Sequence, residues 1–243
     1  MDGRNRMGVK PPGRSRKEKT ILVTAFEPFG GRAVNRSQLV LEHIARAAGA
    51  PRGIRPGARV ITRALPVSFR RLDKALDRAL ACKPDAILML GESASAEELR
   101  LERVAINRVD ARIADNDGAQ PTDERVIEDG PAAYFCTLPL KAALGTVRRA
   151  GAPAALSSNA GLYACNYAYF LALHKTHRRG ADLPVIFVHV PVKSRALALR
   201  NATRGMLALV RHLIDRSDTA ARPPVRRTAS RRVRATPLGG RKA

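Results

Sequence analysis

The chain has 243 residues and 45% hydrophobic side chains, which is typical of one large globular domain and excludes a largely disordered or fibrous protein. Its formal charge of +23 is uneven: residues 1–19 carry seven Lys/Arg against two acidic residues (+5), and residues 215–243 carry nine against two (+7), which leaves +11 between them. No run of about 18 apolar residues is present, so we predict no membrane span. The basic N-terminus has no hydrophobic region behind it, so we predict no signal peptide.

The two ends differ in composition from the rest of the chain. They are poor in large apolar residues and rich in Arg, Pro, Gly, Ser and Thr, a composition that cannot bury enough surface to offset the entropy of ordering. We therefore predict disordered basic tails over residues 1–19 and 215–243 around a folded domain over 20–214. Such tails could contact RNA or DNA through phosphates. A solvated extension without a nucleic-acid partner is the interpretation we favour.

Between the tails, short apolar runs alternate with amphipathic stretches. In chain order we predict a strand over 20–26, a helix over 37–48, a strand over 59–65, a helix capped by Ser68, a strand over 85–90, an exposed or edge strand over 102–109, a helix over 138–150, a strand over 153–157, a helix over 163–178, a strand over 184–190 and a helix over 194–214. This alternation predicts a single α/β domain with a mainly parallel twisted sheet and helices on both faces. Active sites of such sheets gather where strands end, which here means after Phe26, Leu90, Ser157 and Val188.

Three widely spaced cysteines, Cys82, Cys136 and Cys165, are an odd number and include no CxxC pair. This pattern argues against a disulfide framework or a zinc site, so we expect free thiols in a cytoplasmic protein without metal or cofactor.

Cys165 differs from the other two thiols in its surroundings. It follows a short strand and a small-residue loop containing Gly161, and it lies at or near the start of a helix. A helix N-terminus lowers the pKa of a thiol and offers N–H groups to an oxyanion. A small buried hydrophobic residue is the alternative interpretation of Cys165 by itself.

Two further residues have chemistry that suits a thiol nucleophile. His189 interrupts an apolar strand just before Pro191, where a general base would be expected, although a core histidine with a satisfied hydrogen bond is the alternative. Glu102 could orient an imidazole and stabilise its charged form. His174 and His177 are three residues apart on a helix but have no Cys or carboxylate beside them.

Four segments together resemble the pyrrolidone-carboxylate peptidases, or type I pyroglutamyl peptidases. The segments are TAFEPFGG at 24–31 with Asn35, ERVAIN at 102–107 with Asp110 to Asn116 after it, SSNAGLYACN at 157–166, and HVP at 189–191. They occur in the family's order over about residues 20–214. The resemblance implies that Cys165 is the nucleophile, that His189 is its base and then its acid, and that Glu102 orients His189.

The resemblance also implies a substrate and a pocket. The substrate would be a peptide whose N-terminus is blocked by pyroglutamate, cleaved through a thioester. Phe26 and Phe29 would hold the flat lactam ring, Asn35 matches a pocket residue, and Arg112 matches a residue near the oxyanion. Family members often form dimers or tetramers, which implies a homo-oligomer here.

One loop departs from the family pattern. After the third strand the family reads Gly-Gln-Ala-Gly-Gly-Arg, whereas this chain has GESASA at 91–96, so Glu92 replaces a glutamine that contacts the lactam. Desolvating a carboxylate beside a neutral ring is unfavourable unless a cation pairs with it. From this we expect weaker pyroglutamyl selectivity, or a preference for an acyl group with an extra donor or a positive charge. The alternative function is a family member with altered or lost activity that acts as a basic binding module.

Overall fold

The structure is a computed structural model that describes residues 18–51, 53–180, 183–192 and 197–219. The tails predicted over 1–19 and 215–243 therefore lie almost entirely outside the described residues. None of the helices in the described ranges is both long and apolar enough to cross a lipid bilayer.

A six-stranded sheet forms the centre of the fold. Its strands in chain order are β1 (Lys19–Phe26), β2 (Ala58–Leu65), β3 (Ala86–Ser93), β4 (Leu99–Glu102), β7 (Ala154–Ser157) and β8 (Val185–Pro191). They are arranged in the order β2-β1-β3-β8-β4-β7. All neighbours are parallel except β4 and β8, which are antiparallel. The mainly parallel sheet predicted from the sequence is confirmed.

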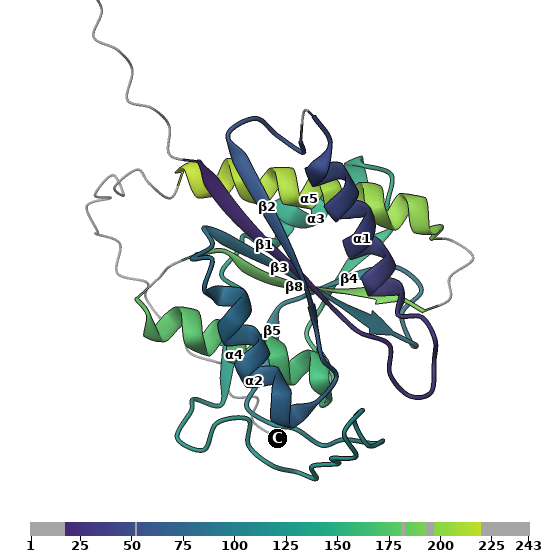
Figure 1. The fold of residues 1–243 in the computed structure, drawn as a ribbon, viewed down its shortest axis with the longest axis vertical. Coiled ribbons are helices and arrows are strands. Elements are labelled where there is room, and N and C mark those ends of the chain that lie inside the picture. Colours follow the sequence, from purple (N-terminus) through teal and green to yellow (C-terminus); the bar gives the residue numbers. More distant parts are fainter. Residues whose placement is uncertain (1–17, 52, 181–182, 193–196, 220–243) are drawn as a thin grey trace, which may run out of the picture.

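Helices cover both faces of this sheet, as Figure 1 shows. They are α1 (Arg36–Gly49), α2 (Phe69–Leu80), α3 (Leu140–Arg149), α4 (Ala164–Arg178) and α5 (Leu199–Thr219). Helices α1, α3 and α5 share one core cluster with the sheet, and α2 and α4 share the other. A small second sheet of β5 (Val104–Ile106) and β6 (Ala133–Phe135) packs against α4. The α/β class with helices on both faces is also confirmed.

Local sequence explains the central elements well. Every residue of β3 from Ala86 to Leu90 is fully buried, which matches its continuous apolar run. The Ser68 hydroxyl accepts a hydrogen bond from the Arg71 N–H at 3.2 Å and so caps α2, as predicted. Leu72, Leu76 and Leu80 then form the buried face of that helix.

The prediction of an exposed or edge strand over 102–109 is confirmed for β5, an edge strand of the two-stranded sheet, and wrong for Glu102. The segment is divided between β4, which ends at Glu102, and β5, and β4 lies inside the main sheet between β8 and β7. Leu101 and Glu102 are fully buried. Polar residues that alternate with apolar ones suggested an exposed strand, but the polar side chain of Glu102 pairs inside the protein with His189.

The last helix begins and ends later than predicted. It was expected over 194–214, but α5 spans Leu199–Thr219, so residues 215–219, which were predicted to belong to the tail, are helical. Its buried face includes Val210, Leu213 and Ile214 and continues to Ser217, which is 5% exposed. One more turn therefore packs on the sheet than the apolar pattern alone indicated.

The carboxyl ends of β1 and β3 separate from each other. Their ladder ends at Thr24 and Met89, although β1 continues to Phe26 and β3 continues to Ser93. By contrast, β3 and β8 stay paired as far as Ser93 and Pro191. This divergence leaves the ends of two central strands free of each other at the edge where the sequence predicted the site.

Candidate active site

Cys165 lies in the first turn of α4, just after the loop that follows β7. The N-cap residue Tyr163 makes no side-chain hydrogen bond to the helix, so it leaves the first-turn N–H groups available to a ligand. These N–H groups and the positive end of the helix dipole both favour a thiolate and an oxyanion at this position. The position of Cys165 at a helix N-terminus agrees with the sequence analysis.

The sulfur of Cys165 lies against the carboxyl end of β3. A Cβ atom placed on Gly91 would be 2.8 Å from the Cys165 Sγ and 2.6 Å from the Cζ of Phe187. Gly91 also lies opposite His189 in the register of β3 and β8. Position 91 of β3 therefore requires glycine, because a side chain there would collide with the Cys165 sulfur and the Phe187 ring.

His189 and Glu102 form a buried pair on neighbouring strands. Arg100 lies opposite His189 in the antiparallel register, so Glu102, two residues further along, is a diagonal neighbour on the same face. The His189 Nδ1 and the Glu102 Oε1 are 2.8 Å apart, and the two side chains are 8% and 0% exposed. The other carboxylate oxygen, Oε2, is buried and has no hydrogen-bond partner among the described residues.

The pKa of His189 reports how these groups act together. Burial by itself lowers this pKa, but the negative charge of Cys165, a hydrogen bond with that sulfur, and the hydrogen bond and charge of Glu102 all raise it. The balance raises the pKa from 6.5 to about 9, so the imidazole is a cation at neutral pH. A thiol, an imidazole and a carboxylate therefore lie in line, which is the arrangement that can activate a thiol nucleophile.

The other two cysteines are in different surroundings. Burial raises the pKa of Cys136, whose thiol donates to the Val185 carbonyl at 3.2 Å, and burial also raises the pKa of Cys82. A raised pKa disfavours the nucleophilic thiolate. Among the three thiols, Cys165 is therefore the candidate nucleophile.

The two phenylalanines predicted to hold the substrate ring differ in their neighbours and in their exposure. Phe26 is only 2% exposed and packs against Phe187, whose ring is in turn 4.9 Å from that of His189, centroid to centroid. Phe29 is partly exposed and its ring centroid lies 5.9 Å from that of Tyr163, two residues before Cys165. Phe26 supports the wall behind the imidazole, and Phe29 is the more accessible ring.

Asn35 has its side chain committed to the backbone. Its Oδ1 accepts hydrogen bonds from the Ser37 N–H at 3.0 Å and the Ser37 hydroxyl at 2.7 Å, which caps α1. Its Nδ2 donates to the Glu27 carbonyl at 3.1 Å. This buried amide therefore joins the two ends of the segment 27–35, which we call the β1–α1 loop.

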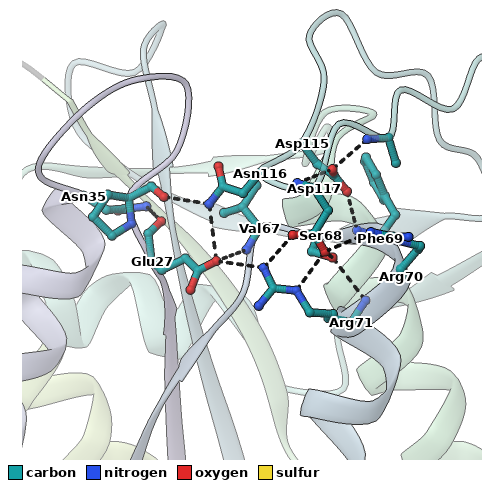
Figure 2. Close-up of polar contacts among 12 residues, drawn as sticks. Glu27, Asn35, Val67, Ser68, Phe69, Arg70, Arg71, Asp115, Asn116 and Asp117 are labelled. Carbon is teal, nitrogen blue, oxygen red and sulfur yellow. Dashed lines mark hydrogen bonds and ion pairs between the residues drawn. The ribbon is translucent and has the colours of Figure 1, made fainter.

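A polar network holds the first half of the β1–α1 loop (Figure 2). The Glu27 Oε1 accepts from the Val67 N–H at 3.2 Å and from the Asn116 Nδ2 at 3.3 Å, and it lies 3.7 Å from the Arg71 guanidinium. Arg71 in turn donates twice to Asp117, at 2.8 and 3.0 Å. The loop after β1 is thereby tied to the start of α2 and to residues 115–117.

Asp115 is the centre of the second half of this network. Its Oδ2 accepts from the Phe69 N–H at 2.7 Å, and its Oδ1 accepts from the N–H groups of Asp117 and Ala119 at 2.9 and 2.8 Å. One buried carboxylate therefore satisfies the N-terminus of α2 and shapes the loop over residues 110–120 (Figure 2).

Glu92 is paired with a cation. Its side chain is 1% exposed, and the Arg32 guanidinium donates to both of its oxygens, at 2.6 and 3.1 Å. The Arg36 N–H donates to the same carboxylate at 3.0 Å. The sequence analysis expected that a buried carboxylate at position 92 needs a cation beside it. Arg32 of the same chain provides that cation.

Arg112 is not part of these contacts. Its side chain is exposed and makes no hydrogen bond or ion pair with the residues that the structure describes. The backbone nearby is fixed beside the catalytic segment, because the Asp110 N–H donates to the Leu162 carbonyl at 2.8 Å. Among the residues that the structure describes, the guanidinium is therefore an unpaired cation on a loop joined to the segment before Cys165.

The sequence analysis missed the structural role of Asn166. This residue is 1% exposed; its side chain accepts from the Ile106 N–H and donates to the carbonyls of Ile106 and Arg108, each at 2.9 Å. It thereby fixes the start of α4 against β5. An amide side chain on the buried side of a helix is the sequence signal that indicates such a role for Asn166.

In the described residues, no group of three or more His, Cys, Asp and Glu side chains is arranged to hold a metal ion.

Comparison with known proteins adds independent information. The model of the family described as "Pyroglutamyl peptidase" matches residues 19–213. A pyrrolidone-carboxylate peptidase of Escherichia fergusonii is 40% identical over 191 residues, which are 78% of this chain and 86% of that protein. One of Clavibacter michiganensis subsp. michiganensis is 44% identical over 174 residues, which are 71% and 78% of the two chains.

A solved structure shows the same fold. The pyrrolidone carboxyl peptidase from Thermococcus litoralis superposes with a TM-score of 0.75 at 34% sequence identity, and the match covers 85% of this chain and 100% of that one. The matched region of the family model includes all the residues described above as a site.

Proposed function

This chain belongs to the pyroglutamyl peptidase family, and we propose that Cys165, His189 and Glu102 are the groups with which it releases N-terminal pyroglutamate from peptides. It is a cysteine peptidase. The observation that supports these roles best is the buried 2.8 Å contact between His189 Nδ1 and Glu102 Oε1, beside a thiol at a helix N-terminus. The substrate is a peptide with a blocked N-terminus.

The reaction begins from the thiolate–imidazolium pair. The Cys165 sulfur attacks the carbonyl carbon that links pyroglutamate to the next residue, and the oxygen of the resulting tetrahedral adduct becomes negative. The free N–H groups of the first turn of α4 can donate to this oxyanion. We propose that the Arg112 cation, which is exposed on the loop over residues 110–120, adds to this stabilisation.

Collapse of the adduct breaks the C–N bond. The His189 imidazolium gives its proton to the departing amine, so the shortened peptide leaves with a neutral amine and Cys165 carries the acyl group as a thioester. The neutral imidazole then takes a proton from water, which attacks the thioester and releases pyroglutamate. The thiolate and imidazolium are restored, and Glu102 stabilises the charged imidazolium throughout.

The lactam ring fits the surroundings of Phe26 and Phe29. Phe26 is the last residue of β1 and Phe29 lies in the β1–α1 loop, next to the point where β1 and β3 separate. We propose that the exposed face of Phe29 covers the ring and that Phe26 and Asn35 hold the shape of the pocket from behind. Nothing in the described residues favours the alternative of a non-catalytic binding module.

Three further expectations accompany this function. Three free cysteines suit a reducing compartment, so we propose a cytoplasmic location. A homo-oligomer, dimer or tetramer, stays a prediction that analytical ultracentrifugation tests. Contact of the basic ends with nucleic acid is the interpretation we do not favour, and a filter-binding titration tests it.

The activity is tested with the full chain and pyroglutamyl-aminomethylcoumarin. Wild type should release the fluorophore, and Cys165→Ser should lose roughly a thousandfold or more in kcat because serine at this site cannot be activated to the same extent. Cys82→Ser is the matched control and should keep the wild-type rate, because that thiol lies at the end of α2. Absence of thiol-dependent hydrolysis in the wild type would refute the proposed function.

A further inference from the structure

The Glu92 carboxylate is almost fully enclosed and fully engaged. Arg32 donates to both of its oxygens in a forked arrangement, and the backbone N–H of Arg36, the first residue of α1, donates to Oε1. Forked guanidinium–carboxylate pairs are short and directional, so they fix the relative position of the two groups as well as binding them. The Arg32 side chain is 42% exposed and forms the outer side of the pair.

The pair connects the β1–α1 loop with the strand beside the thiol. Glu92 directly follows Gly91, where an added Cβ would lie 2.8 Å from the Cys165 Sγ, and successive side chains of a strand point to opposite faces. The Glu92 side chain therefore points away from the sulfur and toward α1. Arg32 lies three residues after Phe29, so the contact holds the loop that carries the accessible ring.

We propose that Arg32 and Glu92 are positioning residues, a clasp that holds the β1–α1 loop against the end of β3 and so sets the place of Phe29 relative to Cys165. The inference rests on the proposed function, since it concerns the pocket for the lactam. It assigns to Glu92 a role that acts through Arg32 and the loop, not through a charge presented to the substrate. The pocket then stays selective for a neutral ring.

The energetics of a buried pair give this clasp a distinctive signature. Removing only the cation leaves an uncompensated carboxylate in a buried site, which is more harmful than removing both charges. Glutamine at position 92 keeps an oxygen that can accept from the Arg36 N–H and from Arg32. The loss of activity should therefore be largest in Arg32→Met, smaller in the double variant and smallest in Glu92→Gln.

The experiment compares full-length wild type, Arg32→Met, Glu92→Gln and the double variant on pyroglutamyl-aminomethylcoumarin. We expect Arg32→Met to raise KM roughly tenfold with kcat within about threefold, because ring placement is disturbed and the reacting groups are not. The double variant should recover at least half of that loss on a logarithmic scale. Glu92→Gln should stay within about threefold of wild type in both constants.

Arg55→Met is the matched control. Arg55 also has a side chain 42% exposed and also contacts a carboxylate at 2.6 Å, that of Asp215, but it lies in the turn before β2, at the opposite end of the strands from Cys165. It should leave KM and kcat unchanged.

Hydrogen exchange of the amides over residues 27–36 gives a readout that does not depend on activity. Exchange should accelerate in Arg32→Met and not in Arg55→Met. An unchanged exchange rate in Arg32→Met, a double variant worse than Arg32→Met, or a several-fold gain of pyroglutamyl turnover in Glu92→Gln would each overturn the clasp. If instead the wild type hydrolyses no pyroglutamyl amide while exchange behaves as expected, the clasp stands and the proposed function fails.

Discussion

Gly91 and His189 show how single residues define this site. The glycine allows the sulfur of Cys165 to approach the strand backbone, and the same register places His189 directly across the ladder. The pKa of His189 is raised to about 9 because its interactions with Cys165 and Glu102 outweigh its burial. Two local properties, the absence of a side chain at Gly91 and the presence of two neighbours that favour a charged imidazole, therefore define the site.

The charge of His189 should depend on Cys165. In Cys165→Ser the largest cause that raises its pKa, the negative sulfur, is absent, so the pKa should fall from about 9 toward its ordinary value of 6.5. NMR titration of the His189 ring proton measures this change.

The same raised pKa has a consequence for stability. A histidine whose pKa is higher in the folded chain than in the unfolded chain stabilises the fold fully below the unfolded value, near 6.5, and loses that contribution as pH rises through about 9. As the pH rises from about 6.5 to about 9, the free energy of unfolding of wild type should therefore fall relative to that of Cys165→Ser. Denaturant unfolding at pH 6 and at pH 9.5 tests the sign, and a difference of the opposite sign would contradict it.

Gly91→Ala should harm activity and stability together. The added methyl would lie 2.8 Å from the Cys165 Sγ and 2.6 Å from the Phe187 ring, so one of the two must move. We expect kcat/KM to fall roughly a hundredfold and the free energy of unfolding to fall by about 1–3 kcal/mol. Gly49→Ala, at the end of α1, where an added Cβ meets nothing within 4 Å, is the control and should not lower either quantity.

At the scale of elements, the loops of the site are held by carboxylates. Glu27 and Asp115 accept hydrogen bonds from the backbone at the start of α2, and Glu92 accepts one from the first residue of α1. Two of them hold opposite ends of the β1–α1 loop, and Asp115 fixes the loop over 110–120 to the start of α2. Strands and helices place Cys165, His189 and Glu102, and these three acidic side chains, Glu27, Asp115 and Glu92, place the segments around them.

Asp115→Asn should weaken this arrangement. An amide nitrogen in place of Oδ2 would face the Phe69 N–H, so two donors would meet where a hydrogen bond existed. We expect a loss of about 1–3 kcal/mol in the free energy of unfolding, measured by denaturant titration. Asp123→Asn is the control: that side chain is 73% exposed and pairs with Arg108, so its change should stay within about 0.5 kcal/mol.

Much of this arrangement could be predicted from the sequence, because strand and helix periodicity is a local property. The apolar run of β3, the Ser68 cap and the helix start at Cys165 all follow from neighbouring residues. The position of β4 could not be predicted, because it depends on pairing with β8, and Glu102 and His189 are 87 residues apart. The Arg32–Glu92 contact joins residues 60 apart, and no local pattern indicates it.

At the scale of the whole molecule, one described domain carries all the residues of the site. The family model matches residues 19–213, while β1 begins at Lys19 and α5 continues to Thr219. The formal charge of +23 is therefore shared between this domain and the two basic ends. The ends are candidates for a function separate from hydrolysis.

A chain of residues 18–219 should keep its activity. It retains the whole of β1 and α5, whereas a chain cut at residue 214 would remove the last buried turn, which includes Ser217. We expect kcat/KM within about twofold of the full chain and a similar melting temperature. The 20–214 chain is the comparison and should melt lower; equal melting of the two would show that the last turn of α5 contributes nothing.

The separation of the three thiols affects how the whole molecule responds to oxidation. Cys136 contacts the carbonyl of Val185 where β8 begins, and Cys82 contacts Ala79 at the end of α2, whereas Cys165 faces the far end of β8. A thiolate that peroxide converts to sulfenic acid is rescued when a second cysteine condenses with it, and neither of these thiols is placed to do so. Excess oxidant should therefore carry Cys165 on to the irreversible sulfinic acid, so the working lifetime of this protein depends on small-molecule reductants around it.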